Sequence, residues 1–256
     1  MSFSNKTIVV TGGAKGIGGG CVRIFHREKG NVVVLDPDEE AGRALCRELG
    51  EGALYVRCDV SRENDVKNAM QQTVAEFGGI DVLVNNAGIM NYATVTETSR
   101  EEWDRVLGVN LTGAFLCAKY AIPYMLEKGA GVVVNMSSVQ AYVAQQKVAA
   151  YVTSKSALVG LTRSIAVDYA PQIRSVAICP GGVDTPLNRE AFQMSPDPEQ
   201  VRQETIDIHL LERMARPEEI GELVAFVASD KGSFITGQPI RIDGGIGAKV
   251  AGSKKD

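Results

Sequence analysis

The stretch that decides the fold is Lys6-Thr7-Ile8-Val9-Val10-Thr11-Gly12-Gly13-Ala14-Lys15-Gly16-Ile17-Gly18. It is typical of a buried strand that leads through a glycine-rich turn directly into a helix. Glycines let the backbone turn sharply and approach a pyrophosphate, whose negative charge is attracted by the N–H groups and dipole at the helix N-terminus. The spacing is G-x-x-x-G-x-G rather than G-x-G-x-x-G, so the loop alone is also compatible with a turn that binds nothing.

Strands and helices alternate along the rest of the chain. Strand-like stretches cover residues 6–11, 31–36, 53–59, 80–85, 131–135, 173–179 and about 238–242. Helical patterns cover residues 16–29, 39–49, 63–77, 100–127, 151–170 and 217–229. The strands are almost continuously apolar, which is typical of strands that are covered on both faces. We therefore predict an α/β fold with a single-domain, doubly wound (Rossmann-type), parallel seven-stranded sheet and helices on both faces.

No Pro/Gly/Ser-rich linker divides this series, so we expect one domain over residues 1–256. Residues 186–216 break the rhythm with Ser195-Pro196-Asp197-Pro198 and a polar helical stretch. A segment that leaves the sheet near the carboxyl ends of the strands is a candidate lid over a ligand. An ordinary surface excursion is the alternative.

Composition narrows the functional classes. The chain is 45% hydrophobic and 23% charged, with a formal net charge of −4. A pI near 5.4 and the lack of a Lys/Arg stripe argue against nucleic-acid partners. No apolar run approaches the roughly 20 residues of a membrane helix, and the N-terminus lacks a signal-peptide pattern, so we expect a cytoplasmic protein without membrane contact. Five scattered cysteines and two histidines, His26 and His209, predict no disulfide framework, no metal site and no histidine triad.

Asp36 indicates which dinucleotide the loop prefers. It closes the second strand about 20 residues beyond the glycines, where an acidic side chain accepts hydrogen bonds from the hydroxyls of an adenosine ribose. At 4 Å and an effective dielectric constant of 20, a 2′-phosphate and this carboxylate would repel by ~4 kcal/mol, which favours NAD. NADP remains the alternative because Lys15 is long enough to reach such a phosphate, although position 37 is Pro and adds no second cation.

Tyr151 and Lys155 are four residues apart in a helical segment, so both side chains lie on one face. We expect the ammonium and a positive nicotinamide to lower the phenol pKa from about 10, so that the phenol takes a proton from an alcohol. Ser138 follows the fifth strand and is suited to hold the substrate oxygen. Such a Tyr/Lys pair by itself is usually structural, and the absence of G-x-S-x-G and of a nearby histidine disfavours a serine nucleophile.

Several motifs together resemble the short-chain dehydrogenase/reductase family. They are Thr11-Gly12-x-x-x-Gly16-x-Gly18, Asn85-Asn86-Ala87-Gly88, Asn110, Ser138, Tyr151-x-x-x-Lys155 and Pro180-Gly181. Their order and spacings are those of the family, and the resemblance extends through Asp243-Gly244-Gly245. Details such as Thr185-Pro186-Leu187 are similar to a hydroxysteroid and L-fucose dehydrogenase subgroup.

The resemblance implies roles for individual residues. Tyr151 would be the acid/base, Lys155 would lower its pKa, Ser138 would hold the substrate oxygen, and Asn110 would bend its helix and anchor a proton-relay water. The implied cofactor-binding residues are Gly12, Lys15, Gly16, Ile17, Gly18, Asp36, Asp59, Val60, Asn86, Ala87, Gly88, Tyr151, Lys155, Pro180, Gly181, Val183 and Thr185. Two alternatives stay open, since Asn86 is also suited to brace the sheet and Asp59 to cap the next helix.

We expect the substrate pocket along residues 89–92, 139–145 and 186 onward, because these follow the carboxyl ends of strands. Substrate contacts are expected from Ser138, Gln145 and Tyr151, with Gln145 bonding a second hydroxyl. The predicted function is NAD-dependent interconversion of a secondary alcohol, of sugar/polyol or steroid type, and a ketone. A catalytically idle NAD-binding regulator and a structural protein are the alternatives. The resemblance also implies a homotetramer built across residues 100–127, residues 151–170 and the C-terminal strand.

Overall fold

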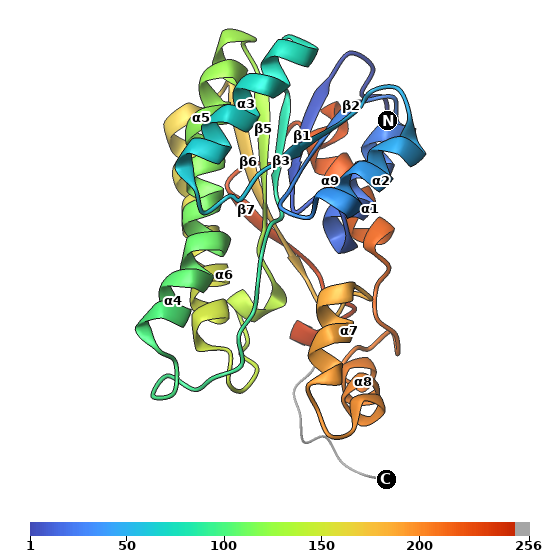
Figure 1. Cartoon of the computed structure of the whole chain (residues 1–256), viewed down its shortest axis with the longest axis vertical. Helices are drawn as coiled ribbons and strands as arrows, with labels where there is room; N and C mark the ends of the chain where they lie inside the picture. The colour runs from blue at the N-terminus through green and yellow to red at the C-terminus, as the bar shows by residue number, and fades with distance from the viewer. Residues whose placement is uncertain (249–256) are drawn as a thin grey trace.

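The computed structural model describes residues 1–248, and its sheet has seven parallel strands in the order β3-β2-β1-β4-β5-β6-β7 (Figure 1). The strands are β1 (Thr7–Thr11), β2 (Asn31–Asp36), β3 (Ala53–Arg57), β4 (Val82–Asn85), β5 (Gly131–Met136), β6 (Ile173–Pro180) and β7 (Gln238–Ile242). The order reverses between β1 and β4, and in open parallel sheets ligands bind outside the carboxyl ends of the strands at such a reversal. The predicted doubly wound parallel sheet is confirmed.

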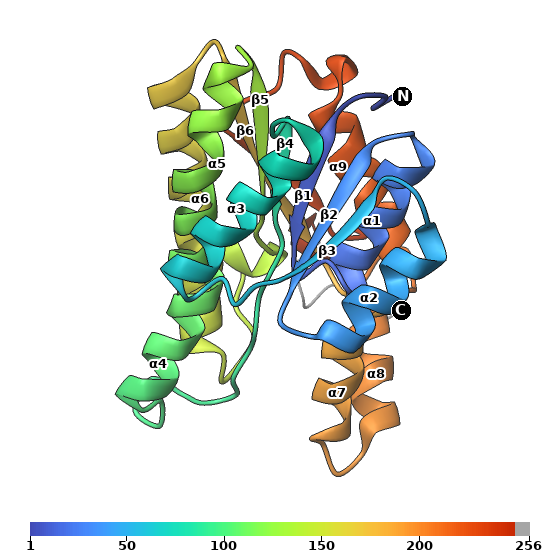
Figure 2. The ribbon, with the colours of Figure 1, turned by 45° about the horizontal axis from the view of Figure 1, so that its top comes forward.

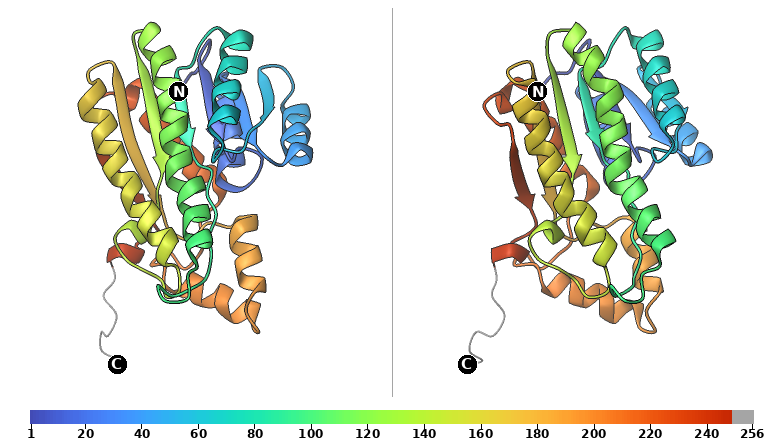
Figure 3. Two further views of the ribbon diagram at one scale, coloured as in Figure 1. Left: turned by 60° about the vertical axis from the view of Figure 1, so that its left-hand side comes forward. Right: turned by 90° about the vertical axis from the view of Figure 1, so that its left-hand side faces the viewer.

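Helices cover both faces of the sheet (Figures 2 and 3). They are α1 (Gly16–Arg27), α2 (Glu39–Leu49), α3 (Glu63–Phe77), α4 (Arg100–Leu107), α5 (Gly113–Glu127), α6 (Ala149–Tyr169), α7 (Pro186–Gln193), α8 (Pro198–Asp207) and α9 (Pro217–Ala228). α1, α2 and α9 lie on one face, and α3, α5 and α6 lie on the other (Figure 2). The crossovers therefore wind onto both sides, as the apolar strands require.

The strands contribute side chains to two hydrophobic cores because successive side chains point to opposite faces of the sheet. In β1, Ile8 and Val10 belong to the core beneath α1 and α9. Val9 belongs to the core beneath α3, α5 and α6. Since both faces are buried, no polar residue alternates with these apolar ones, which explains the continuous apolar strands of the sequence.

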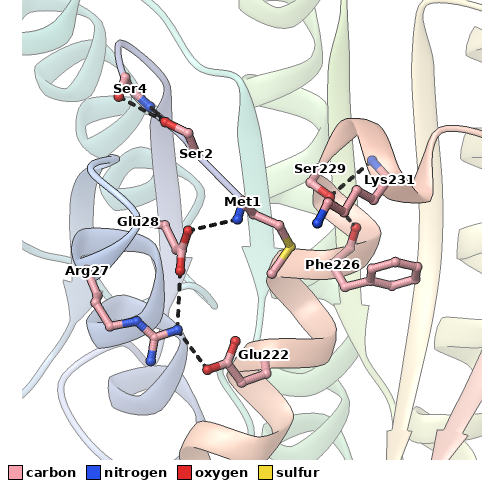
Figure 4. Close-up of polar contacts among 9 residues, drawn as sticks. All are labelled: Met1, Ser2, Ser4, Arg27, Glu28, Glu222, Phe226, Ser229 and Lys231. Carbon is pink, nitrogen blue, oxygen red and sulfur yellow. Dashed lines mark hydrogen bonds and ion pairs between the residues drawn. The ribbon is translucent and has the colours of Figure 1, made fainter.

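α1 packs closely against α9. A Cβ on Gly20 would lie 2.6 Å from the carbonyl carbon of Pro217, so this contact depends on a missing side chain. At the rim, Arg27 pairs with Glu222 of α9 at 2.7 Å and with Glu28 at 3.3 Å (Figure 4). These exposed ion pairs contribute little to stability, and the apolar helix interface holds the two helices together.

The stretch expected to be one helix over residues 100–127 is interrupted. A π-helical turn, Gly108–Thr112, separates α4 from α5 and contains Asn110. Such turns insert an extra residue into the helical ladder, and periodicity alone does not reveal them. By length and composition the whole stretch could cross a membrane, but half of its most apolar window is buried inside the protein, as in a core helix.

The candidate lid is a pair of short helices. α7 and α8 project beyond the carboxyl end of the sheet (Figure 1). Each begins at a proline, and each is capped by the residue before it, Thr185 for α7 and Asp197 for α8. Proline at the first helical position and an oxygen-bearing cap are strong start signals, so the local sequence determines both helix starts.

Candidate active site

The glycine loop lies against two distant segments. Gly12 and Gly16 have positive φ angles of 60° and 53°. A Cβ on Gly12 would lie 2.9 Å from Ala87 Cα, and one on Gly16 would lie 3.3 Å from Thr185 Cβ. A Cβ on Gly18 would overlap the Gly12 carbonyl oxygen. The loop therefore needs glycine at these positions, and three predicted cofactor segments meet here.

The start of α1 is open to an anion. Lys15 precedes the helix in an extended conformation, and within the described chain no side chain caps the first N–H groups. Uncapped N–H groups and the helix dipole at a helix start are suited to bind an anion. Ile17, also predicted here, is half-buried and packs against the core beneath α1.

Asn86 braces the loop from β4. Its Nδ2 donates to the carbonyl oxygens of Thr11 and Gly12, both at 3.0 Å. The Thr11 hydroxyl oxygen accepts from the main-chain N–H groups of Asn86 and Ala87, both at 3.0 Å. The bracing alternative for the Asn86 side chain therefore has direct support, and a contact with the ribose stays a prediction.

Asp36 stands beside the loop at the end of β2. Its Oδ2 accepts from Ala14 N at 3.1 Å, and its Oδ1 accepts from Asp38 N at 2.9 Å. Lys15 does not stand free, because its Nζ pairs with Asp38 Oδ2 at 2.6 Å. That contact raises the pKa of Lys15 and lowers the pKa of Asp38. The cation considered as a partner for a 2′-phosphate is thus engaged by a carboxylate.

Asp59 and Val60 lie between β3 and α3. Asp59 Oδ1 accepts from the main-chain N–H and the hydroxyl of Ser61, at 3.0 and 2.7 Å. The carboxylate therefore braces the turn that leads into α3, which resembles the capping alternative. Val60 is buried and lies against Gly113.

The predicted catalytic residues come together at the carboxyl edge of the sheet. Ser138 follows β5, and Tyr151 lies in the first turn of α6; the Ser138 hydroxyl is near enough to the phenol to act on its pKa. Lys155 is only 4% exposed, and its Nζ donates to Met136 O at 2.7 Å and lies 5.5 Å from the Tyr151 ring centroid. A Cβ on Gly88 would lie 3.4 Å from that Nζ, so the Asn86–Gly88 loop borders the same place.

The phenol pKa corrects one prediction. Burial raises the pKa of Tyr151 to about 12, and the polar Ser138 side chain acts in the opposite direction. Burial also lowers the pKa of Lys155 to about 8. In the protein without cofactor the pKa of Tyr151 therefore lies above its usual value and not below it as expected, because withdrawal from water opposes the charged form of the phenol; lowering by the nicotinamide charge stays a prediction.

Asn110 links the pocket loop to α6. Its Oδ1 accepts from Ile89 N at 2.8 Å, and its Nδ2 donates to Ile89 O at 2.9 Å and to Ser154 Oγ at 3.0 Å. Ser154 in turn donates to Tyr151 O at 2.7 Å. The side chain of the π-helical turn thus positions the helix that carries Tyr151, and a bound water at Asn110 stays a prediction.

The segment after β6 connects the sheet to the lid. Pro180 ends β6, and Gly181 continues into the isolated pairing of Val183. Val183 O accepts from Asn188 Nδ2 at 2.7 Å. Thr185 Oγ1 accepts from Asn188 N at 3.3 Å, which leaves its hydroxyl proton free to donate. This geometry is compatible with the grip on a carboxamide that the resemblance implies.

The predicted substrate segments carry unpaired acceptors. Gln145 is exposed, and its Oε1 accepts from Gln140 Nε2 at 3.3 Å. Gln140 N donates to Ser138 Oγ at 3.1 Å, which places this residue beside Ser138. Within the described residues, Gln140 Oε1 and Asn91 Oδ1 are buried and have no hydrogen-bond partner. Buried oxygens of this kind need a hydrogen-bond donor, which an ordered water or a ligand would supply.

Sequence reasoning gave no individual role to Asn188, Gln140 or His209, although all three lie in the segments expected to border the substrate. Asn188 and Gln140 bond only to residues nearby in the chain, whereas His209 is revealed by its bond with the distant Gly182. His209 was considered only as a metal ligand or triad member, yet it is buried against the segment after β6. Over residues 1–248, no cluster of three or more His, Cys, Asp or Glu side chains is placed to hold a metal ion.

Comparisons with known proteins agree with this geometry. A family profile described as enoyl-(acyl carrier protein) reductase matches residues 12–247. The chain is 41% identical to cis-4-hydroxycyclohexanecarboxylate dehydrogenase of Sinomonas cyclohexanicum, covering 96% of this chain and 98% of that protein. It is 38% identical to L-fucose dehydrogenase of Oryctolagus cuniculus, covering 95% and 85% of the two chains.

Two solved structures are also close. The ligand-free aldohexose dehydrogenase of Thermoplasma acidophilum superposes with a TM-score of 0.92 at 38% identity, over 99% of this chain and 98% of that one. The 3-ketoacyl-(acyl-carrier-protein) reductase of Brucella melitensis, complexed with NADH, superposes with a TM-score of 0.89 at 32% identity, over 96% and 99%. With this fold, these motifs and these relatives, the chain belongs to the short-chain dehydrogenase/reductase family of oxidoreductases.

Proposed function

We propose that the protein is an NAD-dependent oxidoreductase that interconverts a secondary alcohol and a ketone by hydride transfer, with Tyr151 as general acid/base. The observation that carries this proposal is the grouping of Ser138 and Tyr151 with the buried Lys155, at the sheet edge next to the glycine loop. By name, the relatives include dehydrogenases of a ring alcohol and of sugars, which agrees with this chemistry.

The residues at the loop fit a dinucleotide. Gly12, Gly16 and Gly18 let the loop turn and pack more tightly than a side chain would allow, and the start of α1 offers uncapped N–H groups to a pyrophosphate. Asp36 stands where an adenosine ribose would present its hydroxyls. When bound, the nicotinamide ring supplies the hydride acceptor and a positive charge.

The Tyr151 phenol donates or accepts the proton that accompanies hydride transfer. A phenol with a pKa of about 12 carries its proton at neutral pH and is ready to donate it to a carbonyl oxygen in the reductive direction. In the oxidative direction Tyr151 must first lose that proton, which nearby positive charge makes easier. Lys155, with a pKa of about 8, is mostly protonated at neutral pH and supplies part of that charge. Ser138 holds the substrate oxygen at the phenol.

Asp36 and Asp38 support NAD over NADP. Asp36 presents a carboxylate to the ribose, and Asp38 pairs with Lys15, the nearest cation of the loop. A 2′-phosphate would therefore meet two carboxylates and a lysine that is already paired. The preference rests on charge, because like charges repel at this range.

The unpaired oxygens of Asn91 and Gln140 support a polyhydroxylated substrate. A sugar or polyol brings several O–H donors, whereas a steroid ring system would leave both oxygens buried and unpaired. Each such loss costs about 1–3 kcal/mol. Of the two substrate classes predicted from sequence, the sugar or polyol class is therefore favoured.

The assembly of the chain and its location in the cell are proposed from the sequence and the family resemblance. We infer a cytoplasmic homotetramer of single-domain chains, each with residues 186–216 as a lid over its substrate. Large apolar side chains stand exposed on the surfaces expected to form interfaces: Phe115 on α5 (48%), Val167 on α6 (80%) and Phe234 before β7 (104%). Where exposed apolar side chains form a contiguous patch, the patch commonly marks a contact between chains.

Replacing Tyr151 by phenylalanine tests the function. With NAD and a panel of sugars, polyols and hydroxysteroids, we expect NADH formation by the wild-type protein and a loss of 10²–10⁴-fold in Tyr151→Phe, the usual contribution of a general acid/base. Binding of NAD, measured by calorimetry, should stay within a few-fold. An idle regulator would bind NAD without turnover of any alcohol, and full activity in the variant would remove Tyr151 from the mechanism.

A further inference from the structure

His209 is a buried histidine that the mechanism above does not use. It follows α8 and is 3% exposed. Gly182 N donates to His209 Nε2 at 2.9 Å, and His209 Nδ1 lies 2.6 Å from Thr205 O. Because Nε2 accepts a hydrogen bond, the proton of the neutral ring resides on Nδ1, where it is donated to the Thr205 carbonyl. Both ring nitrogens are therefore committed, and the ring is held in one tautomer.

Three glycines make room for this ring. A Cβ on Gly181 would lie 3.0 Å from Nε2, one on Gly182 would lie 2.8 Å from Cε1, and one on Gly244 would lie 2.9 Å from Cδ2. Gly181 and Gly182 follow β6, Gly244 follows β7, and His209 belongs to the lid segment. The imidazole thus joins the ends of two neighbouring strands to the helix pair that projects over the site.

The hydrogen bond to His209 completes the anchoring of the main chain around Val183. Gly182 O accepts from Ala215 N, and Asp184 N donates to Ala215 O, both at 2.9 Å. These two bonds hold the segment on the side of Ala215 and leave the Gly182 N–H without a main-chain partner. His209 supplies the acceptor for this partly buried donor.

We propose that His209 is the positioning residue for the nicotinamide end of the cofactor. By holding the Gly182 amide it sets the orientation of Val183 and Thr185, the residues expected to grip the carboxamide. The inference rests on the proposed function, since it requires a nicotinamide in the cleft. His209 acts through the main chain of Gly182 and touches neither cofactor nor substrate.

The test compares two ligands that differ only at the end in question. NADH carries the nicotinamide, and ADP-ribose lacks it but keeps the adenosine, pyrophosphate and second ribose. By calorimetry we expect His209→Leu to weaken NADH about tenfold (~1.4 kcal/mol) while ADP-ribose changes less than twofold. His209→Gln should restore most of the NADH affinity, because its amide oxygen can accept from Gly182 N.

A matched control is available in the same chain. His26 on α1 also bonds a main-chain carbonyl through its ring, that of Glu51 at 2.9 Å, but lies on the opposite end of the sheet from the lid. His26→Leu should leave the affinity for both ligands unchanged. Equal weakening of NADH and ADP-ribose in His209→Leu would show a general structural role and overturn the proposal, as would no change for either ligand.

A measurement on the wild-type protein covers the case in which His209→Leu fails to fold. The ¹⁵N shifts of the His209 ring should report a protonated Nδ1 and an unprotonated, hydrogen-bonded Nε2. A protonated Nε2 would rule out the bond from Gly182 and with it the inference. If the wild-type protein binds ADP-ribose but not NADH, the proposed function itself fails, which is a different outcome from any of those for the variants.

Discussion

Replacing Asp36 by asparagine should relax the choice between NAD and NADP. The carboxylate accepts from Ala14 N and Asp38 N, one oxygen for each donor. Asparagine keeps one of these acceptors and removes the negative charge, so the loop is disturbed less than it would be by alanine. The substitution therefore tests the charge of Asp36.

The size of the effect follows from the charges around the ribose. A carboxylate and a 2′-phosphate 4 Å apart repel by ~4 kcal/mol at an effective dielectric constant of 20, and salt and solvent at this partly exposed edge reduce that value. Lys15 offsets little of it, because it is paired with Asp38 at 2.6 Å. If only about a third of the repulsion survives, ~1.4 kcal/mol, the affinity ratio of NADH to NADPH falls tenfold.

The assay is the dissociation constant of each reduced cofactor, measured by calorimetry at fixed ionic strength for the wild-type protein and Asp36→Asn. We expect the NADH-to-NADPH affinity ratio to fall at least tenfold, mainly through tighter NADPH binding, and the gain to shrink at high salt. Glu40→Gln, which removes one charge from the exposed first turn of α2, is the matched control and should change the ratio little. An unchanged ratio in Asp36→Asn would refute the role given to its charge.

Two further predictions concern stability and assembly. Burial works to raise the pKa of Asp81, but hydrogen bonds from Lys128, Thr7 N and Lys6 outweigh it, so the pKa is lowered in the folded protein. Asp81→Asn should therefore lower the free energy of unfolding, measured with urea at pH 7, by about 2 kcal/mol. The difference in this free energy between wild type and variant should shrink as the pH falls below the unfolded pKa of Asp near 3.9 and then through the lower pKa of the folded protein. A constant difference down to pH 2 would contradict this linkage. Light scattering should report four copies of the 27.4 kDa chain, about 110 kDa, with Val167→Glu shifting the protein to smaller species, whereas a wild-type monomer would reject the proposed assembly.

The fold was predictable because its signals are local. Apolar runs such as residues 31–36, bounded by turn residues, indicate strands covered on both faces, and the alternation with helices permits few topologies. The interruption at Gly108–Thr112 was not predictable from periodicity, since a π-helical turn leaves the apolar pattern of α5 intact. What marks it is the side chain of Asn110, which bonds the distant Ile89.

For the candidate site, the order of motifs predicted which residues meet but not the pKa values of their side chains. Ser138, Tyr151 and Lys155 do come together, as their positions at strand and helix ends predicted. The pKa of Tyr151 moved opposite to expectation, because a pairwise view of phenol and ammonium omits the loss of water around both.

The sequence by itself determined the doubly wound sheet, the glycine turn at its switch point and the order of the catalytic residues, because these depend on periodicity and on residue types at fixed spacings. Only the tertiary structure decided that Lys15 is held by Asp38, and that a histidine dismissed as a catalyst anchors the segment after β6. The physical reason is that hydrogen-bond partners and burial are set by segments far apart in the chain, whose approach no local pattern records.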